Sequence, residues 1–323
     1  MIFRLNQNEK LFVDLKSLSD FRTPLMGISI ILVLLCHAKM DGANLPCYIL
    51  KILNLGNWGV DIFFLLSGIG MYFSITKKNI QNQAWFDWYK RRFYRVLIPY
   101  FILETPYWIW YCIDNDEGVI SFLYYISMLS FWCEHIGLWF LALLIPLYII
   151  TPVLYKIFNT RYGVLYLILL LTITLTSPLI VRNIFNNNII CNILGVIVRV
   201  PCFLIGLYYG KKIKEGKNVN FLYLILLLLA FHIIPFLSLM SKSWIWGLIC
   251  SVLFVKMLSS FSSSLKILEV FGKYTLEIYI SLDVLTNLLS AVLEKGTLFW
   301  LLTILGSCSL SFIYVKIKRF RLV

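Results

Sequence analysis

The chain has 323 residues, of which 60% are hydrophobic and 14% are charged, and its mean hydropathy is +0.83. Soluble domains are about 45–50% apolar and about 25% charged, so this composition excludes a soluble globule and also a disordered chain. The formal net charge of +13 would suggest a nucleic-acid partner in a soluble protein. In so apolar a chain the positive-inside rule explains the charge, and the sequence predicts a polytopic membrane protein that binds no nucleic acid.

Apolar windows of about 20 residues, the length that crosses a bilayer, recur ten times. They cover residues 23–38, 58–75, 93–112, 138–157, 163–181, 189–209, 219–239, 244–258, 270–290 and 298–316. The apolar stretch 119–132 is too short to span, so it is expected to be interfacial or re-entrant. The predicted fold is an all-α bundle of about ten transmembrane helices. It forms a single domain (23–316) between an N-terminal segment (1–22) and a basic tail (317–323).

Lysine and arginine are distributed unevenly over the loops between these spans. One side carries 22 of them, and Arg199 and Lys273 fall inside spans. The other side has only five, namely Lys39, Lys51, Arg182, Lys242 and Lys295. Because cytoplasmic loops are rich in Lys and Arg, both termini are predicted to be cytoplasmic. The loop 113–137, with four acidic residues and no Lys or Arg, then faces outward.

Cysteine spacing and the motifs of soluble enzymes add little. The eight cysteines form no CxxC pair and show no metal-ligand spacing, so no metal is expected. A disulfide between Cys47 and Cys133, both in predicted external loops, is left open. The GxSxG, GxxxxGK[ST] and HExxH signatures are absent.

His37 ends the apolar run PLMGISIILVLLCH of the first predicted span. A lone membrane histidine often serves helix packing, yet an ionisable residue at this depth is costly and is therefore a functional candidate. Imidazole also exchanges a proton near neutral pH. His135, in the external acidic loop, could contact a substrate or simply lie at the interface, and His232 has no supporting motif and is interpreted as structural.

Asp61 enters the second span, at the depth of His37 in the predicted topology. A carboxylate beside an imidazole can fix its tautomer and stabilise the imidazolium. Asp41, four residues after His37, could do the same if the helix continues that far.

The same segment, NWGVDIFFLLSGIGMYF (57–73), contains the small residues Ser67, Gly68 and Gly70. Small side chains allow another helix, or an elongated ligand, to approach the backbone closely. Helix packing is the simpler of these two interpretations.

A basic cluster begins the third span, within WYKRRFYRVLIPY (88–100); it comprises Lys90, Arg91, Arg92 and Arg95. Such clusters usually reflect topology and anionic lipid headgroups. The alternative is a phosphate-bearing cytosolic ligand, which suits forked guanidinium groups. Arg92 and Arg95 are three residues apart, so both can face one groove.

These features, in this order, resemble the acyltransferase 3 family of polytopic membrane acyltransferases over about residues 20–290. The blocks that carry the resemblance are His37, GVDIFFLLSG (59–68), YKRRFYRVLIPY (89–100), HIGLWFLALLIPLYIITPVL (135–154), FLIGLYYGKK (203–212) and FGKYTLEIYISLDVL (271–285). Two positions depart from the family pattern. Met26 stands where the family usually has an arginine, with Arg22 four residues earlier as its potential substitute, and Leu282 stands where a histidine is often found.

The resemblance implies transfer of an acyl group, commonly acetyl, from cytosolic acyl-CoA to an acceptor hydroxyl outside, often on a sugar. His37 is then the catalytic base, with Asp61 beside it. Arg22, Arg91, Arg92, Arg95 and Ser67 are assigned to the acyl-CoA donor. The residues assigned to the acceptor are His135, Trp139, Glu277 and Asp283.

The sequence thus predicts an O-acyltransferase of the bacterial cytoplasmic membrane, acting on an extracytoplasmic glycan and surrounded by membrane lipids. The alternative is a transporter or flippase that exports a glycan or lipid intermediate, which ten spans and buried charges would also suit. Binding or hydrolysis of acyl-CoA would discriminate the two. The acceptor, the acyl group and the oligomeric state, a homo-oligomer included, are left open.

Overall fold

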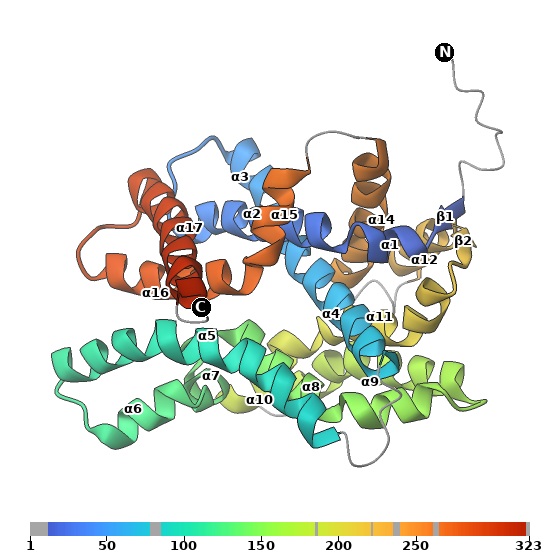
Figure 1. The fold of residues 1–323 in the computed structure, drawn as a ribbon, viewed down its shortest axis with the longest axis horizontal. Coiled ribbons are helices and arrows are strands. Elements are labelled where there is room, and N and C mark those ends of the chain that lie inside the picture. Colours follow the sequence, from blue (N-terminus) through green and yellow to red (C-terminus); the bar gives the residue numbers. More distant parts are fainter. Residues whose placement is uncertain are drawn as a thin grey trace.

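The computed structural model describes residues 12–77, 85–184, 187–220, 222–234, 240–260 and 265–320. Within these ranges the chain is helical apart from one short antiparallel ribbon, in which β1 (Phe12–Asp14) pairs with β2 (Asn218–Asn220). The ribbon joins the start of the described chain to the segment that follows α11 (Figure 1). The predicted helical fold class is confirmed, with this ribbon as its departure.

The helices follow one another with short connections. They are α1 (Lys16–Asp20), α2 (Arg22–Met40), α3 (Cys47–Asn54), α4 (Trp58–Thr76), α5 (Trp85–Asp114), α6 (Val119–Ile126), α7 (Leu129–Glu134), α8 (Trp139–Phe158), α9 (Gly163–Ile184), α10 (Asn188–Ile197), α11 (Val200–Lys214), α12 (Leu222–Ile233), α14 (Ser243–Ser260), α15 (Lys266–Lys273), α16 (Thr275–Ser290) and α17 (Thr297–Phe320). A 3₁₀ turn, Leu55–Asn57, connects α3 to α4.

Seven helices of the described chain are long and apolar enough to cross a membrane, and an eighth span results if α10 and α11, which meet at a bend of 41°, count as one. They correspond to eight of the ten predicted spans. Of the other two, 219–239 contains the 12-residue α12 and then residues outside the described ranges. The window 270–290 contains the end of α15 and the 16-residue α16. A multi-pass helical protein is therefore confirmed, and the count of ten stays a prediction, as does the orientation of the termini.

The predicted outer loop contains two short helices in place of a span. α6 and α7 are separated at Met128, whose φ of 63° ends the first helix. The expectation that 119–132 does not cross the membrane as one helix agrees with this break. Cys133, at the end of this stretch, and Cys47 are both free thiols, so the disulfide left open by the sequence does not form.

α4 is the central helix of the bundle (Figure 1). The span that contains it, Cys47–Thr76, is 72% buried inside the protein, whereas the span of α9 is only 17% buried. α4 and α11 pack with their backbones in contact. A Cβ on Gly68 would lie 2.2 Å from the Phe203 carbonyl oxygen, and a Cβ on Gly206 would lie 2.2 Å from that of Leu65. This reciprocal pair of glycines fixes how closely the two helices approach.

A methyl group at this contact should destabilise the fold. We expect Gly206→Ala to lower the free energy of unfolding by about 1–3 kcal/mol, the usual cost of overpacking. The control is Gly195→Ala on α10, because no atom lies within 4 Å of a Cβ there and alanine favours a helix. Thermal unfolding in detergent measures both, and a Gly206→Ala protein as stable as the control would contradict the packing described.

Candidate active site

Residues from α2, α4, α5, α8, α15 and α16 enclose a narrow cavity of about 110 Å³, here called the arginine cavity. Five of the predicted site residues line it, namely Arg22, Ser67, Arg92, Arg95 and Glu277. Ligand pockets for whole small molecules are usually about 300–1,000 Å³. The arginine cavity therefore has room for a slender arm of a ligand, with the bulk of that ligand outside.

Three guanidinium groups converge on this cavity. Arg22 is the first residue of α2, and Arg92 and Arg95 lie one turn apart on α5. The Arg22 Nε donates to the Leu66 carbonyl at 3.4 Å. Gly70 allows this approach, since a Cβ there would lie 2.8 Å from an Arg22 Nη. Gly68 therefore serves helix packing, the simpler of the two interpretations from the sequence, whereas Gly70 accommodates the Arg22 side chain.

The positive charge of the cavity is not neutralised by ion pairs. Among the described residues Arg199 pairs with Asp61 and Lys217 pairs with Glu215, and these ion pairs do not involve the three arginines of the cavity. Lys273 also lines the cavity, and Glu277 is its one acidic lining residue. A cavity with four cationic side chains and one carboxylate is a site for an anion.

Tyr148 is a lining residue that the sequence analysis did not single out. Its side chain is 9% exposed and lies within electrostatic range of all three arginines, and its hydroxyl interacts with Ser67. The residue falls in the quoted block 135–154, but one tyrosine among so many aromatics gives no signal by itself. It contributes a hydroxyl group to the cavity wall beside the three arginines.

The cavity extends along α2 toward His37. Its lining includes Arg22 and Val33, which are about 16 Å apart along a helix, and His37 follows Val33 by one turn. His37 is half-buried, and its Nδ1 is buried without a hydrogen-bond partner. The predicted catalytic base therefore lies just beyond the end of the cavity, with an unused ring nitrogen.

Asp41 follows His37 by one further turn and closes α2. It is 2% exposed, and its Oδ2 is buried without a partner. Burial raises the pKa of the Asp41 carboxyl to about 6, although the ammonium group of Lys295 opposes part of the shift. Two unpartnered polar atoms on neighbouring turns mark the end of α2 as a polar spot in an apolar bundle.

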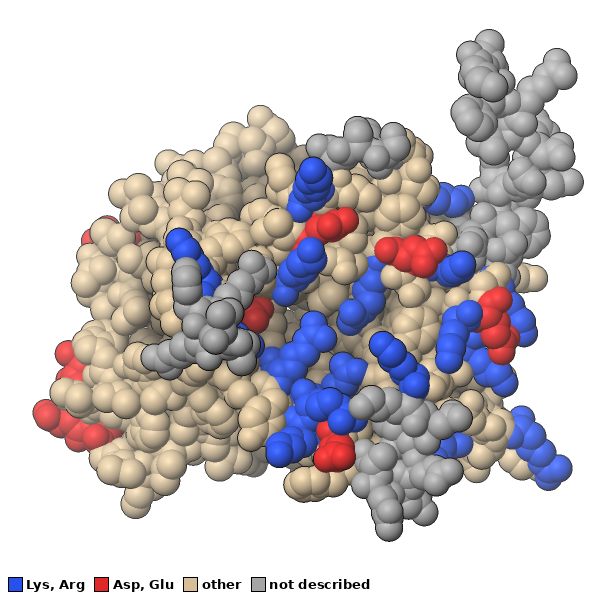
Figure 2. All heavy atoms as spheres, in the orientation of Figure 1, with Lys and Arg blue, Asp and Glu red and all other residues tan. Residues whose placement is uncertain are grey.

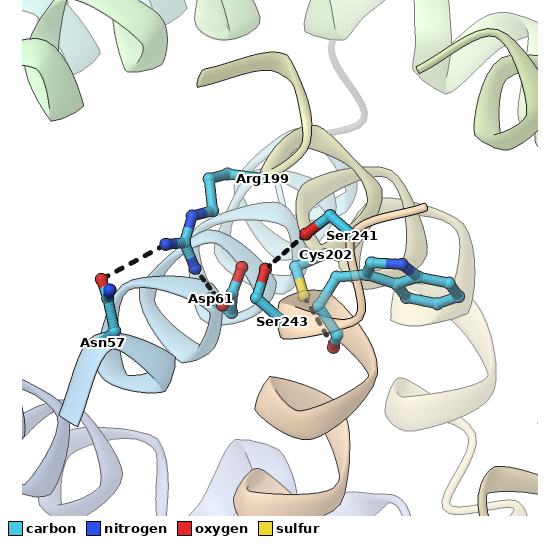
Figure 3. A network of polar contacts seen from close by, with 7 residues as sticks. Asn57, Asp61, Arg199, Cys202, Ser241 and Ser243 are labelled. Carbon is cyan, nitrogen blue, oxygen red and sulfur yellow. Dashed lines mark hydrogen bonds and ion pairs between the residues drawn. The ribbon is translucent and has the colours of Figure 1, made fainter. Parts of the chain in front are cut away.

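Asp61 has a different partner from the one predicted. Its Oδ2 accepts from Arg199 Nη1 at 2.5 Å, and Arg199 Nη2 donates to the Asn57 side chain at 3.2 Å. Figure 3 shows this network, with Ser241 and Ser243 nearby. Asp61, which is fully buried, therefore compensates a half-buried cation at the bend between α10 and α11. The contacts of Asp61 do not support the expectation that it orients His37. Its negative charge is instead balanced by the positive charge of Arg199, which lies in another predicted span.

The other predicted donor and acceptor residues do not gather at one place. Arg91 is exposed and does not line the arginine cavity. His135 is exposed and ends α7 with a φ of 63°, while Trp139 begins α8 and is half-buried. Glu277, assigned to the acceptor, instead lines the arginine cavity near Arg95.

Asp283 lies near a second buried carboxylate, Glu104 of α5. Glu104 is 1% exposed, and both its carboxylate oxygens lack a hydrogen bond of normal geometry. The side chain of Trp108, one turn further along α5, is close enough to interact with them. The sequence analysis missed Glu104 although it stands as the one acidic residue inside the apolar third span.

A family model described as an acyltransferase domain matches residues 25–316, which is nearly the whole chain. No curated protein and no solved structure matches it.

The ion pair at the helix bend gives a stability prediction. Asp61→Asn leaves Arg199, whose side chain is only 14% exposed, without a counter-charge, so we expect the free energy of unfolding to fall by up to about 3–5 kcal/mol, the cost of breaking a buried pair. Adding Arg199→Gln should restore most of it, because the uncompensated charge is then gone. Thermal unfolding of the single and double variants measures this, and an Asp61→Asn protein as stable as wild type would show that the pair is not structural.

Proposed function

The chain belongs to the acyltransferase domain family, and from that premise we propose that it is a membrane O-acyltransferase. In this proposal it moves an acyl group, acetyl first among the candidates, from cytosolic acyl-CoA to a hydroxyl of an extracytoplasmic glycan or polysaccharide. His37 acts as the general base. The membrane concerned is the bacterial cytoplasmic membrane, crossed ten times, with both termini inside.

The single observation that carries the proposal is the arginine cavity. Arg22, Arg92 and Arg95 face a narrow space without ion-pair partners among the described residues. The diphosphate and 3′-phosphate of coenzyme A would supply the missing negative charge beside these three arginines. The slender pantetheine arm would enter a space of about 110 Å³, which is too narrow for the nucleotide.

The direction of the cavity supports transfer across the membrane. Figure 2 shows Lys and Arg side chains gathered over the middle of one face of the molecule, above α5 and the end of α4. Under the positive-inside rule this is the cytoplasmic face. The donor would therefore enter from the cytoplasm, and its thioester would extend along α2 toward His37.

The proposed reaction requires the protein to position the acceptor and the thioester and to transfer one proton. The imidazole of His37 takes the proton of the acceptor hydroxyl as the oxygen attacks the thioester carbonyl. The carbon–sulfur bond then breaks, and the departing thiolate receives the proton, which leaves an ester and free coenzyme A. Asp41, one turn beyond His37, is the nearest carboxyl group along α2 that could steady the imidazolium.

The competing function is a transporter or flippase for a glycan or lipid intermediate, since a cationic cavity could also bind a phosphate carried by such a substrate. The family membership favours the acyltransferase. Purified protein in detergent decides between them: an acyltransferase binds labelled acetyl-CoA and hydrolyses it slowly, whereas a flippase binds neither acetyl-CoA nor its product.

His37→Ala tests the general base. A positioned base contributes about 10²–10⁴-fold to a rate, so we expect a loss of that size in acetyl transfer measured with radiolabelled acetyl-CoA. The thermal midpoint should stay near that of wild type. His232→Ala, which changes an exposed histidine of α12, is the matched control and should keep its activity. Near-normal transfer by a well-inserted His37→Ala protein would refute this role.

Arg95→Ala and Arg91→Ala test the donor site as a pair. Both remove one cation from the same end of α5, but only Arg95 lines the arginine cavity. A charge-assisted contact is worth about 1.5–3 kcal/mol, so Arg95→Ala should raise the KM for acyl-CoA at least about tenfold and leave that for the acceptor nearly unchanged. Arg91→Ala should change neither. Equal effects of the two substitutions would favour binding of lipid headgroups over binding of the donor.

A further inference from the structure

A second and larger cavity lies on the far side of α4 and α11 from the arginine cavity. It has a volume of about 630 Å³ and is here called the lateral groove. Its walls come from α9, α11, α12 and α14, and α1 covers one end with Leu15 and Leu18. On α11 the lining residues run from Ile205 to Ile213, about 12 Å along the helix axis. That length is close to half of the roughly 30 Å hydrocarbon thickness of a bilayer, which is the depth of one leaflet.

The lateral groove opens toward the side of the bundle rather than toward either end. Val164 and Ile168 of α9 line it and are more than half exposed. The span of α9 is also the least buried of the candidate spans. In a membrane such an opening faces lipid tails, which makes a lipid chain the natural occupant of an apolar space here.

The end of the groove near α1 is basic. Lys212 lines it, and its Nζ lies 4.8 Å from the centre of the Tyr209 ring. Lys211 and Lys214 share the last turn of α11, and none of the residues that line the groove is acidic. Glu215, the nearest acid in sequence, is paired with Lys217 at 2.9 Å. A negatively charged headgroup would therefore be attracted to this end.

A third observation concerns the groove wall itself. Trp244 lines the groove and is 3% exposed, yet its indole nitrogen has no hydrogen-bond partner. A buried donor left unpaired is costly, so Trp244 adds one unsatisfied polar group to a groove that is otherwise apolar. Its backbone carbonyl accepts from the Cys202 thiol, and Cys202 precedes Lys212 by ten residues on α11, so this group lies away from the basic end.

We propose that the lateral groove binds one anionic phospholipid, with an acyl chain along α11 and its headgroup at Lys212. This site is separate from the arginine cavity and does not depend on the acyl-transfer activity. The lipid packs behind the glycine contact between α4 and α11, so it supports the same wall that bounds the arginine cavity on its other side.

The test is native mass spectrometry of the purified full-length chain titrated with dioleoyl phosphatidylglycerol and, separately, with dioleoyl phosphatidylcholine. Wild type should bind one phosphatidylglycerol more tightly than phosphatidylcholine. Lys212→Gln should weaken phosphatidylglycerol binding about fivefold, since one cation near a lipid surface is worth about 1 kcal/mol, and should leave phosphatidylcholine binding unchanged. Lys211→Gln removes the same charge one residue away, from a side chain that does not line the groove, and should weaken phosphatidylglycerol binding much less than Lys212→Gln does.

A second variant tests occupancy of the groove without relying on charge. Ile168→Trp fills the opening from an exposed position, so it should fold normally and should abolish tight binding of both lipids. The proposal is overturned if Lys211→Gln and Lys212→Gln weaken binding equally. It is also overturned if Ile168→Trp retains the tightly bound lipid, or if wild type binds the two lipids equally well.

Discussion

Moving a guanidinium group from water into an apolar interior costs several kcal/mol unless a counter-charge or a polar space receives it. The protein meets this cost in two different ways. Arg199 is paired with Asp61 at 2.5 Å and hydrogen-bonded to Asn57, so its charge is balanced within the fold. Arg22 and Arg92, which are half-buried, have no such partner and face a cavity instead, and Arg95 lines the same cavity from an exposed position. This contrast distinguishes a structural charge from charges that could bind a ligand. Only the arginines of the arginine cavity can still attract an anion.

α4 contributes to both the Arg199–Asp61 pair and the wall of the arginine cavity. Gly68 packs against the α11 backbone, while Ser67 contacts Tyr148 and Gly70 contacts Arg22 in the wall of the arginine cavity. Asp61, nearly two turns before Ser67, holds Arg199 at the start of α11. The position of the cavity wall therefore depends on how closely α4 and α11 approach. Substitutions at the glycine contact should therefore weaken the proposed donor binding as well as the stability of the protein.

Much of this could be predicted from the sequence because membrane spans and charge asymmetry are local signals. Eight of the ten predicted spans correspond to helices of spanning length, counting the bent pair, and Arg22, Ser67, Arg92 and Arg95 do line one cavity. The partner of Asp61 could not be predicted in this way. Arg199 was visible as a charge inside a span, but its contact is with a residue 138 positions away, and only the packing of α11 on α4 brings the two together. Glu277 and Asp283 were grouped because they share a motif, whereas six residues along a helix put them about 9 Å apart on different sides.

The geometry of α2 brings Arg22 to the same cavity as Met26, the residue at the position of the family's usual arginine. Met26 and Arg22 both line the arginine cavity, one turn and about 6 Å apart along the helix. The sequence alone argues against this arrangement, because Pro24 disfavours a helical conformation at Thr23, the residue before it. In the structure α2 begins at Arg22, so Pro24 lies in the first turn, where its missing N–H removes no helical hydrogen bond. The helix start then aims Arg22 toward Leu66 and Gly70, and its long side chain can lean over the remaining offset. The place of Arg22 on the helix, rather than its exact position in the sequence, therefore determines where its charge acts.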